Sequence, residues 1–268
     1  LIPMPWFINT AFGIESLGST VILFMWGTVL SILSEITHRF ELTRKYSLPV
    51  LLASIPTFAL GIITGFVYST PFGMAVAFCA AVIYTALHIL RVRWWLWTLA
   101  LLNFIIAYFA FVSLEFMQKV MPFFGYQMLV LSVLFLLPDL FLKKDLLADK
   151  EWRLPARIYG TLFAVYLSLT LLTRSESGHA AICFGAYTLF FAAYAFVQRK
   201  AIFGYIPAVY LPLTIIFALD YFNVAAWMTA LTVLAVLYFV AGVAIRSKEK
   251  WSLMLRNSAL ALGTLLSF

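Results

Sequence analysis

Charge is scarce in this sequence, and its scarcity argues against an ordinary water-soluble fold. Only 11% of the 268 residues are charged, whereas 64% are apolar and the mean hydropathy is +1.01. Soluble domains are about 25% charged and about 45–50% apolar, so this chain would leave much of its apolar surface facing water. The lipid bilayer is therefore the expected solvent for most of its side chains.

Familiar catalytic motifs are also missing from the sequence. It contains no G-x-S-x-G, no phosphate-binding glycine loop and no H-E-x-x-H. The two cysteines, Cys79 and Cys183, fall within apolar runs and are expected to be free thiols. Aspartate, glutamate, lysine and arginine are absent from the middle of the apolar runs, which argues against a proton relay or an ion pump built on buried charge.

Long apolar runs are what the sequence has in abundance. Crossing about 30 Å of hydrocarbon as a helix takes roughly 20 residues, and the runs do not alternate as the strands of a membrane barrel do. Backbone groups in lipid must be paired inside a helix or a closed barrel. We therefore predict an all-α polytopic integral membrane protein with about nine transmembrane helices and a partial tenth that begins near Ser258. The expected spans are 17–36, 48–68, 72–90, 94–114, 126–142, 156–173, 180–197, 202–219 and 224–245.

Basic connections recur at regular intervals, each about the length of one helical hairpin. Two explanations stay open, namely a tandem array of helical hairpins or the ordinary period of any polytopic protein with short loops. We treat 1–268 as a single transmembrane helical domain. Hairpin pairing leaves the first span and the last segment without partners, which favours a chain that is a window of a longer one.

Lysine and arginine mark one side of the predicted membrane. All of them except Lys119 and Arg174 lie in alternate connections. Basic residues are retained in cytoplasmic loops, so we predict a plasma or inner membrane protein whose N-terminus faces outward. This topology and attraction to anionic lipids account for the net charge of +7 without nucleic acid as a partner. The predicted cytoplasmic segments are 37–47, 91–93, 143–157, 198–204 and 246–257.

Three histidines are the residues to weigh for cofactor or acid–base chemistry. His38 and His88 lie near the same predicted membrane face and are the candidates for haem or metal ligation, although we favour an interfacial polar role for each. Metal sites draw three or four ligands at characteristic spacings, and the sequence has no such cluster, so we predict no cofactor and no metal. His179 has only Glu176 as a nearby carboxylate, which makes an acid–base role the less favoured interpretation.

Glycines, prolines and one amide mark places for close packing or for a pathway. Gly61 and Gly65 form a G-x-x-x-G pattern, which predicts close helix packing. Pro56 and Pro212 are expected to kink their spans, either without a cavity, which we favour, or with freed carbonyl groups lining one. Asn103 is expected to make an interhelical hydrogen bond, with substrate contact as the alternative.

These features favour three classes of function. The first is a non-catalytic multi-pass membrane subunit or scaffold that packs against lipids and other membrane protein subunits. The second is a transporter or flippase for an apolar or lipid-like substrate, which requires a cavity of several hundred Å³. The third is a membrane enzyme acting on a lipid-linked substrate. Its acids would come from Glu15, Glu115, Glu176 and Asp220 on the outer side or from Glu35 and Asp139 on the inner side.

Overall fold

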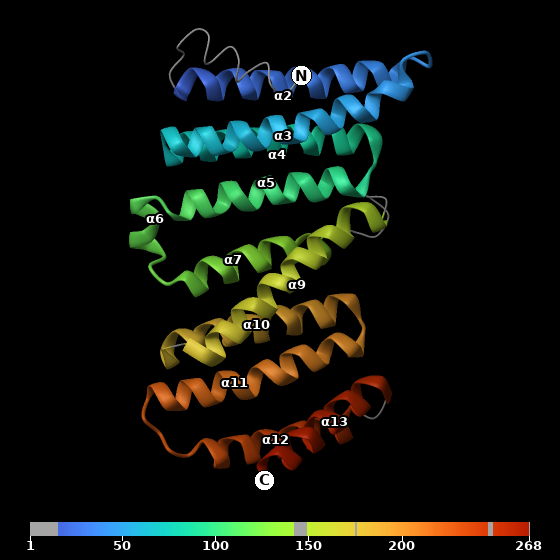
Figure 1. Ribbon diagram of the computed structural model, residues 1–268. Helices are drawn as coiled ribbons and strands as arrows, with labels where there is room; N and C mark the ends of the chain where they lie inside the picture. Colours follow the sequence, from blue (N-terminus) through green and yellow to red (C-terminus); the bar gives the residue numbers. More distant parts are fainter. Residues whose placement is uncertain (1–15, 142–148, 175, 246–248, 268) are drawn as a thin grey trace. The chain divides into compact units, whose positions relative to one another are not determined.

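The computed structural model describes residues 16–141, 149–174, 176–245 and 249–267. Within these ranges the regular structure is entirely helical (Figure 1). The chain separates into two compact units, Leu1–Pro122 with Lys144–Ala156 and Phe123–Lys143 with Arg157–Phe268. The single domain expected from the sequence stays a prediction.

Helices that follow one another in the first unit also pack against one another, as short connections require. Only Ser69 separates α3 from α4, and its hydroxyl caps α4 by accepting the Phe72 N–H at 3.4 Å. Val92 adopts the left-handed conformation, with φ of 46°, and ends α4. The helices are α2 (Ser16–Arg39), α3 (Arg44–Tyr68), α4 (Thr70–Arg91), α5 (Trp94–Val112) and the short α6 (Glu115–Val120).

The second unit also brings sequence neighbours together. Helix α10 packs against α11, and α12 packs against α13, while α7 lies against α10. Helix α9 (Asp149–Arg174) contributes its first residues to the first unit and the remainder to the second. The other elements are α7 (Phe124–Leu136), α8 (Pro138–Phe141), α10 (Ser177–Gln198), the 3-10 helix η1 (Ala201–Gly204), α11 (Tyr205–Tyr221), α12 (Trp227–Ala244) and α13 (Glu249–Leu266).

Eight helical segments in the described part of the chain are long and apolar enough to cross a membrane. Each overlaps a span expected from the sequence, and α7 is a further, shorter apolar helix of 13 residues. The predicted fold class is therefore confirmed: the chain is an all-α polytopic membrane protein. The eight segments are Leu17–Arg39, Arg44–Tyr68, Thr70–Arg91, Trp94–Val112, Trp152–Thr173, Ser177–Gln198, Ala201–Tyr221 and Trp227–Ala244.

Two expected segments differ from the structure. The span expected over 126–142 is interrupted, because α7 ends at Leu136 and Pro138 begins the separate helix α8. Proline has no N–H to donate and its ring clashes with the preceding turn. The partial tenth helix expected from Ser258 belongs to α13, which begins earlier, at Glu249. A search for apolar runs misses that start because the first turn of α13 is charged.

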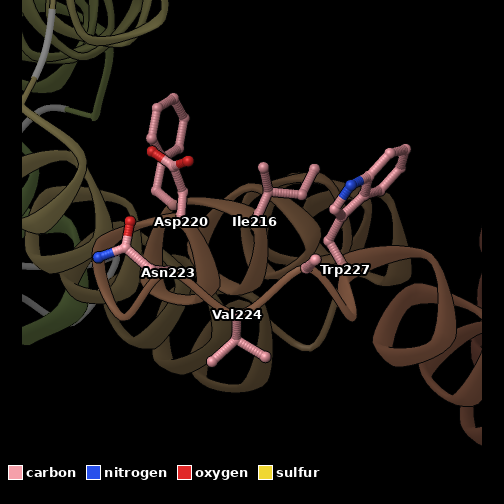
Figure 2. Close-up of a pocket in the computed structure, with 7 residues that line it drawn as sticks. Ile216, Asp220, Asn223, Val224 and Trp227 are labelled. Carbon is pink, nitrogen blue, oxygen red and sulfur yellow. The ribbon is translucent and has the colours of Figure 1, made fainter.

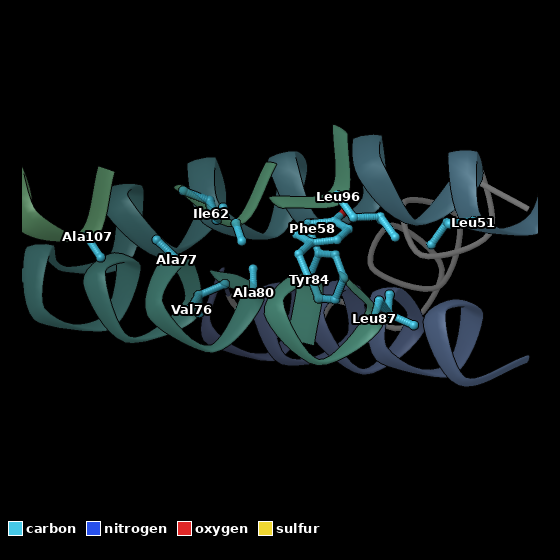
Figure 3. Close-up of a cluster of buried hydrophobic side chains, with 11 residues drawn as sticks. Leu51, Phe58, Ile62, Val76, Ala77, Ala80, Tyr84, Leu87, Leu96 and Ala107 are labelled. Carbon is cyan, nitrogen blue, oxygen red and sulfur yellow. The ribbon is translucent and has the colours of Figure 1, made fainter. Parts of the chain in front are cut away.

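The core of the first unit lies between α3, α4 and α5 (Figure 3). Phe58 and Tyr84 meet edge to face at its centre, with ring centroids 5.5 Å apart, and both side chains are almost completely buried. Ala77 and Ala80 present no exposed surface. Small residues of this kind let helix backbones approach closely in lipid, where packing rather than water drives association.

Aromatic rings dominate the contact between α10 and α11 in the second unit. Phe184 and Tyr187 are completely buried, and the Tyr210 ring lies 5.8 Å and 5.4 Å from them, between centroids. The tyrosines also form hydrogen bonds through their hydroxyl groups. Tyr187 bonds to the Ser132 hydroxyl of α7 at 2.7 Å, and Tyr210 bonds to that of Ser168 in α9 at 2.9 Å. These bonds join four helices of the unit.

The Tyr187→Phe substitution should destabilise the protein by about 1–2 kcal/mol, because it removes a buried hydrogen bond with good geometry. Tyr84→Phe is the matched control: the Tyr84 hydroxyl lies 3.5 Å from Ser54 Oγ, which is too long for a strong bond. We expect its cost to be below about 0.5 kcal/mol. Reversible unfolding in mixed micelles measures both changes in the free energy of unfolding. Equal losses would contradict a stabilising hydrogen bond between Tyr187 and Ser132.

Candidate functional site

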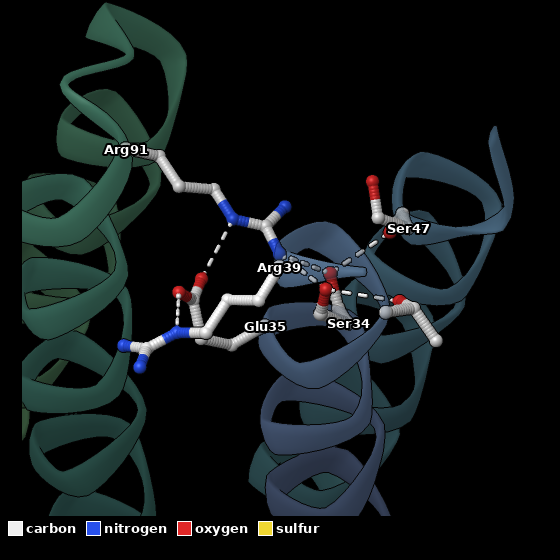
Figure 4. A network of polar contacts seen from close by, with 6 residues as sticks. Ser34, Glu35, Arg39, Ser47 and Arg91 are labelled. Atoms are coloured by element: carbon white, nitrogen blue, oxygen red, sulfur yellow. Dashed lines mark hydrogen bonds and ion pairs between the residues drawn. The ribbon is translucent and has the colours of Figure 1, made fainter. Parts of the chain in front are cut away.

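Charged side chains meet at one end of the first unit (Figure 4). Glu35, in the last turn of α2, accepts a hydrogen bond from Arg39 at 3.1 Å and another from Arg91 of α4 at 3.0 Å. The two arginines differ in burial, since the Arg39 side chain is 68% exposed and the Arg91 side chain only 7%. We call Ser34, Glu35, Arg39, Ser47 and Arg91 the Glu35 network.

Arg91 also binds Ser34 in the neighbouring helix. Its Nη2 donates to the Ser34 carbonyl at 2.5 Å and to the Ser34 hydroxyl at 2.9 Å. The Ser34 hydroxyl donates in turn to the Ser47 carbonyl of α3 at 2.8 Å. The planar guanidinium can donate to Glu35 through Nε and to Ser34 through Nη2 at the same time. The compact ammonium group of lysine cannot reproduce this arrangement. The Glu35 network thus joins α2, α3 and α4 and places the α2–α3 and α4–α5 connections at the same end of the unit.

His88 is completely buried in the last turn of α4. Its Nδ1 lies 2.8 Å from the Arg93 carbonyl oxygen, and its own carbonyl accepts the Val92 N–H at 2.6 Å. Its ring stacks on Trp97 and meets Trp152 edge-on at a centroid distance of 4.2 Å. Trp97 Nε1 donates to the Trp152 carbonyl at 2.7 Å. His88 therefore fixes the tight turn between α4 and α5.

The two histidines considered as ligands have different surroundings. His38 is half-buried, and four charged side chains act on it electrostatically: Arg44, Arg91, Arg93 and Glu35. His88 is enclosed by tryptophan rings, and its Nε2 has no hydrogen-bond partner among the described residues. That part of the chain contains no group of three or more His, Cys, Asp and Glu able to hold a metal ion. The predicted absence of a cofactor, with an interfacial polar role for His38 and His88, stays a prediction.

Gly61 and Gly65 lie where α3 approaches its neighbours. A Cβ added at Gly61 would lie 3.5 Å from Leu23 Cβ in α2. A Cβ added at Gly65 would lie 3.0 Å from Gly73 Cα in α4 and 3.4 Å from Thr20 Cγ2 in α2. Both positions thus fit the close helix packing favoured from the G-x-x-x-G pattern.

The prolines and the amide are each accommodated within one helix. Pro56 and Pro212 lie inside α3 and α11, which continue through them. Asn103 is buried, and its Nδ2 donates to the Leu99 carbonyl at 2.8 Å, one turn earlier in α5. The sequence favoured an interhelical bond for Asn103, whereas this donor is satisfied within its own helix.

A second polar cluster lies in the second unit, where α7 and α10 begin. His179 Nδ1 is 2.7 Å from the Tyr126 hydroxyl, and His179 Nε2 is 3.2 Å from a carboxylate oxygen of Glu176. Phe123 stacks on the imidazole with ring centroids 4.5 Å apart. We call Phe123, Tyr126, Glu176 and His179 the His179 cluster. It joins two helices, and its imidazole is held on both nitrogens.

An open hollow of about 610 Å³ lies beside the turn that joins α11 to α12 (Figure 2). Asp220 and Asn223 supply its polar groups, and Ile216 and Trp227 are among its apolar walls. Ser177 of α10 donates a hydrogen bond to Asp220, so this carboxylate already has a partner. The hollow has the volume of a small-molecule site, but the residues predicted to line a pathway, Asn103, Pro56 and Pro212, are not part of it.

Two of the other carboxylates considered for an enzyme, Glu35 and Glu115, have described side chains. Glu35 belongs to the Glu35 network, and Glu115 begins the short helix α6. Glu15 and the side chain of Asp139 lie outside the described residues, as do 143–148 and 246–248 of the predicted cytoplasmic segments.

Sequence reasoning missed two of these partnerships. It interpreted Arg91 only as a marker of topology, although Arg91 and Glu35 both end apolar spans at the same predicted membrane face, which is a signal for an ion pair. It related His179 only to Glu176, its neighbour three positions away. Tyr126 lies 53 positions from His179, and no local pattern connects them.

Comparison with known proteins provides no relative for this chain. No family model, no curated protein and no solved structure matches it. What stands is the architecture itself, an apolar, multi-helix, all-α chain of the kind found in membrane proteins.

Proposed function

We propose that this chain is a non-catalytic multi-pass membrane subunit or scaffold that packs against lipids and other membrane protein subunits. The observation that carries the proposal is the exposed apolar flank of α12. Helix α12 buries only Leu231, Leu234 and Gly242, whereas most residues of α11, which packs against α10, are partly buried. Apolar side chains of α12 such as Val236 and Phe239 are more than half exposed. Lipid tails and partner helices are the surroundings that suit such a flank.

Polar side chains within the spans support the same proposal. Many hydroxyl groups donate to a carbonyl one turn earlier in their own helix, which removes them from lipid without lining a pathway. Examples are Thr57 to Ala53, Thr85 to Ala81, Thr188 to Phe184 and Thr232 to Met228. A transporter would instead need polar groups directed toward a shared cavity.

We place the basic connections on the cytoplasmic side, as their charge favours. The Glu35 network supports a common side for two of them in the first unit. In the second unit, Asn257 donates to the Tyr205 hydroxyl at 3.1 Å, and a Cβ at Gly204 would touch Met254, so the α10–α11 and α12–α13 connections share an end. A Leu42→Cys variant should react with a membrane-impermeant maleimide only in inside-out vesicles, and labelling from the outside would reverse the orientation.

Site-specific photocrosslinking tests the subunit proposal. A photoreactive phenylalanine analogue at Val236, on the uncovered face of α12, should give one discrete, saturable adduct with a partner polypeptide in native membranes. The same analogue at Leu231, on the buried face of α12, is the control and should crosslink only within the chain. A purified lone chain that forms no adduct from α12 and moves lipids between leaflets of vesicles would overturn the proposal in favour of a flippase.

A further inference from the structure

The basic end of the first unit carries more positive charge than its carboxylates neutralise. Segments 35–45 and 91–93 together contain five cationic side chains and two carboxylates, so their net charge is +3 without His38. The cations are Arg39, Arg44, Lys45, Arg91 and Arg93, and the carboxylates are Glu35 and Glu41. Glu35 is already shared by Arg39 and Arg91. Neither Arg44 nor Arg93 forms an ion pair with any other described residue.

Arg44 and Arg93 come from different connections that the Glu35 network holds at the same end of the first unit. Arg44 begins α3, one turn before Ser47, and Arg93 follows the Val92 turn, two positions after Arg91. Ser47 and Arg91 both bond to Ser34. Both arginine residues are exposed, and His38 is half-buried in the last turn of α2, at the same end of the unit. Two guanidinium groups and an imidazole are the donor set that recognises phosphate oxygens, because a guanidinium can give two parallel hydrogen bonds to one anion.

The backbone that carries Arg93 is held in place before any ligand arrives. The completely buried His88 ring bonds to the Arg93 carbonyl at 2.8 Å, and the left-handed Val92 fixes the direction of the turn. Arg91, two positions earlier, is tied to Glu35 and Ser34. A pre-organised turn reduces the conformational entropy that binding would otherwise cost.

Exposed apolar side chains flank these cations in the sequence. Phe40, Leu42 and Trp94 are 63%, 91% and 58% exposed. Amphipathic and aromatic groups beside cations are typical of the membrane interface. We propose that Arg44 and Arg93, assisted by His38, bind the phosphate group of an anionic membrane lipid. This inference rests on the membrane placement in the proposed function; free phosphate shares the chemistry, and the test separates the two sources.

The test measures binding of short-chain phosphatidic acid to the full chain in neutral detergent by native mass spectrometry. Replacing both arginines (R44Q/R93Q) should weaken binding about tenfold, because two charge-assisted contacts are lost. The matched control R199Q/K200Q removes the same charge from the second unit and should retain the affinity within about twofold. R44K/R93K keeps the charge without the planar fork and should lose about threefold.

Equal weakening by R44Q/R93Q and R199Q/K200Q would overturn the site, since binding would then follow net charge alone. Unchanged binding by R44Q/R93Q would overturn it as well. Inorganic phosphate at about 10 mM should leave the lipid bound; displacement would assign the site to soluble phosphate and contradict the lipid source. If the parent chain does not bind the lipid but its Val236 variant still crosslinks to a partner, this inference is wrong and the subunit proposal stands.

Discussion

A valine at position 73 should prevent α3 and α4 from packing as they do in the native first unit. A Cβ on Gly73 would lie 2.5 Å from Phe66 Cδ1 and 2.8 Å from the Phe66 backbone nitrogen. The ring can rotate, but the backbone atom cannot move without shifting α3. Because overpacking of this kind strains rotamers and backbone together, we expect a loss of about 3 kcal/mol in the free energy of unfolding. Unfolding in mixed micelles of increasing sodium dodecyl sulfate fraction measures it.

The control for Gly73→Val is Gly263→Val in α13, where an added Cβ meets nothing within 4 Å. Its effect should stay within about 0.5 kcal/mol, since only helix propensity changes. Gly61→Ala gives an intermediate case, because its nearest neighbour would be at the ordinary contact distance of 3.5 Å. If the Gly73 and Gly263 variants unfold alike, the close approach of α3 and α4 is wrong.

Replacing Arg91 by glutamine should cost about 2–3 kcal/mol, far more than the same change at Arg39. Arg91 is buried, and its loss removes the bond to Glu35 together with both bonds to Ser34. A carboxylate that is only 17% exposed then keeps a single, solvent-exposed partner. Breaking one side of a buried pair is costly because the remaining charge stays desolvated.

Arg39→Gln is the matched control for Arg91, because both arginines bond to the same carboxylate. An exposed pair contributes only about 0–1 kcal/mol, so this variant should unfold close to the parent. Replacing Glu35 and Arg91 together by glutamine should recover at least about 1 kcal/mol relative to the sum of the single changes, since the two residues are coupled. Additive effects would show that the Glu35 network does not stabilise the helix contact.

Most of the fold could be predicted from the sequence because membrane spans are a local property. A run of about 20 apolar residues specifies its own helix in lipid, and eight of the nine expected spans overlap helical segments of spanning length. The prediction of one continuous span over 126–142 was wrong at Pro138, because a hydropathy scale does not account for the N–H that proline lacks. The start of α13 at Glu249 was missed because its first turn carries the charge that a hydropathy search treats as loop.

The polar contacts were less predictable because they depend on which helices become neighbours. Gly61 and Gly65 could be interpreted from their own spacing, and the geometry fits that interpretation. The Asn103 amide could donate a hydrogen bond to another helix or to its own helix. The side-chain conformation in α5, which the sequence does not reveal, directs it to the Leu99 carbonyl. Arg91 and Glu35 are 56 positions apart, so their pairing requires the packing of α2 against α4 to be known first.

That separation of 56 positions has a consequence for biogenesis. At a translation rate of about 5–20 residues per second, roughly 3–11 s pass between synthesis of Glu35 and synthesis of Arg91. During that interval Arg39, one turn further along the same helix, is already present as a counter-ion for Glu35. Arg91 is made with α4 and bonds to the other carboxylate oxygen, so the full set of contacts around Glu35 can form only after α2, α3 and α4 have all been synthesised.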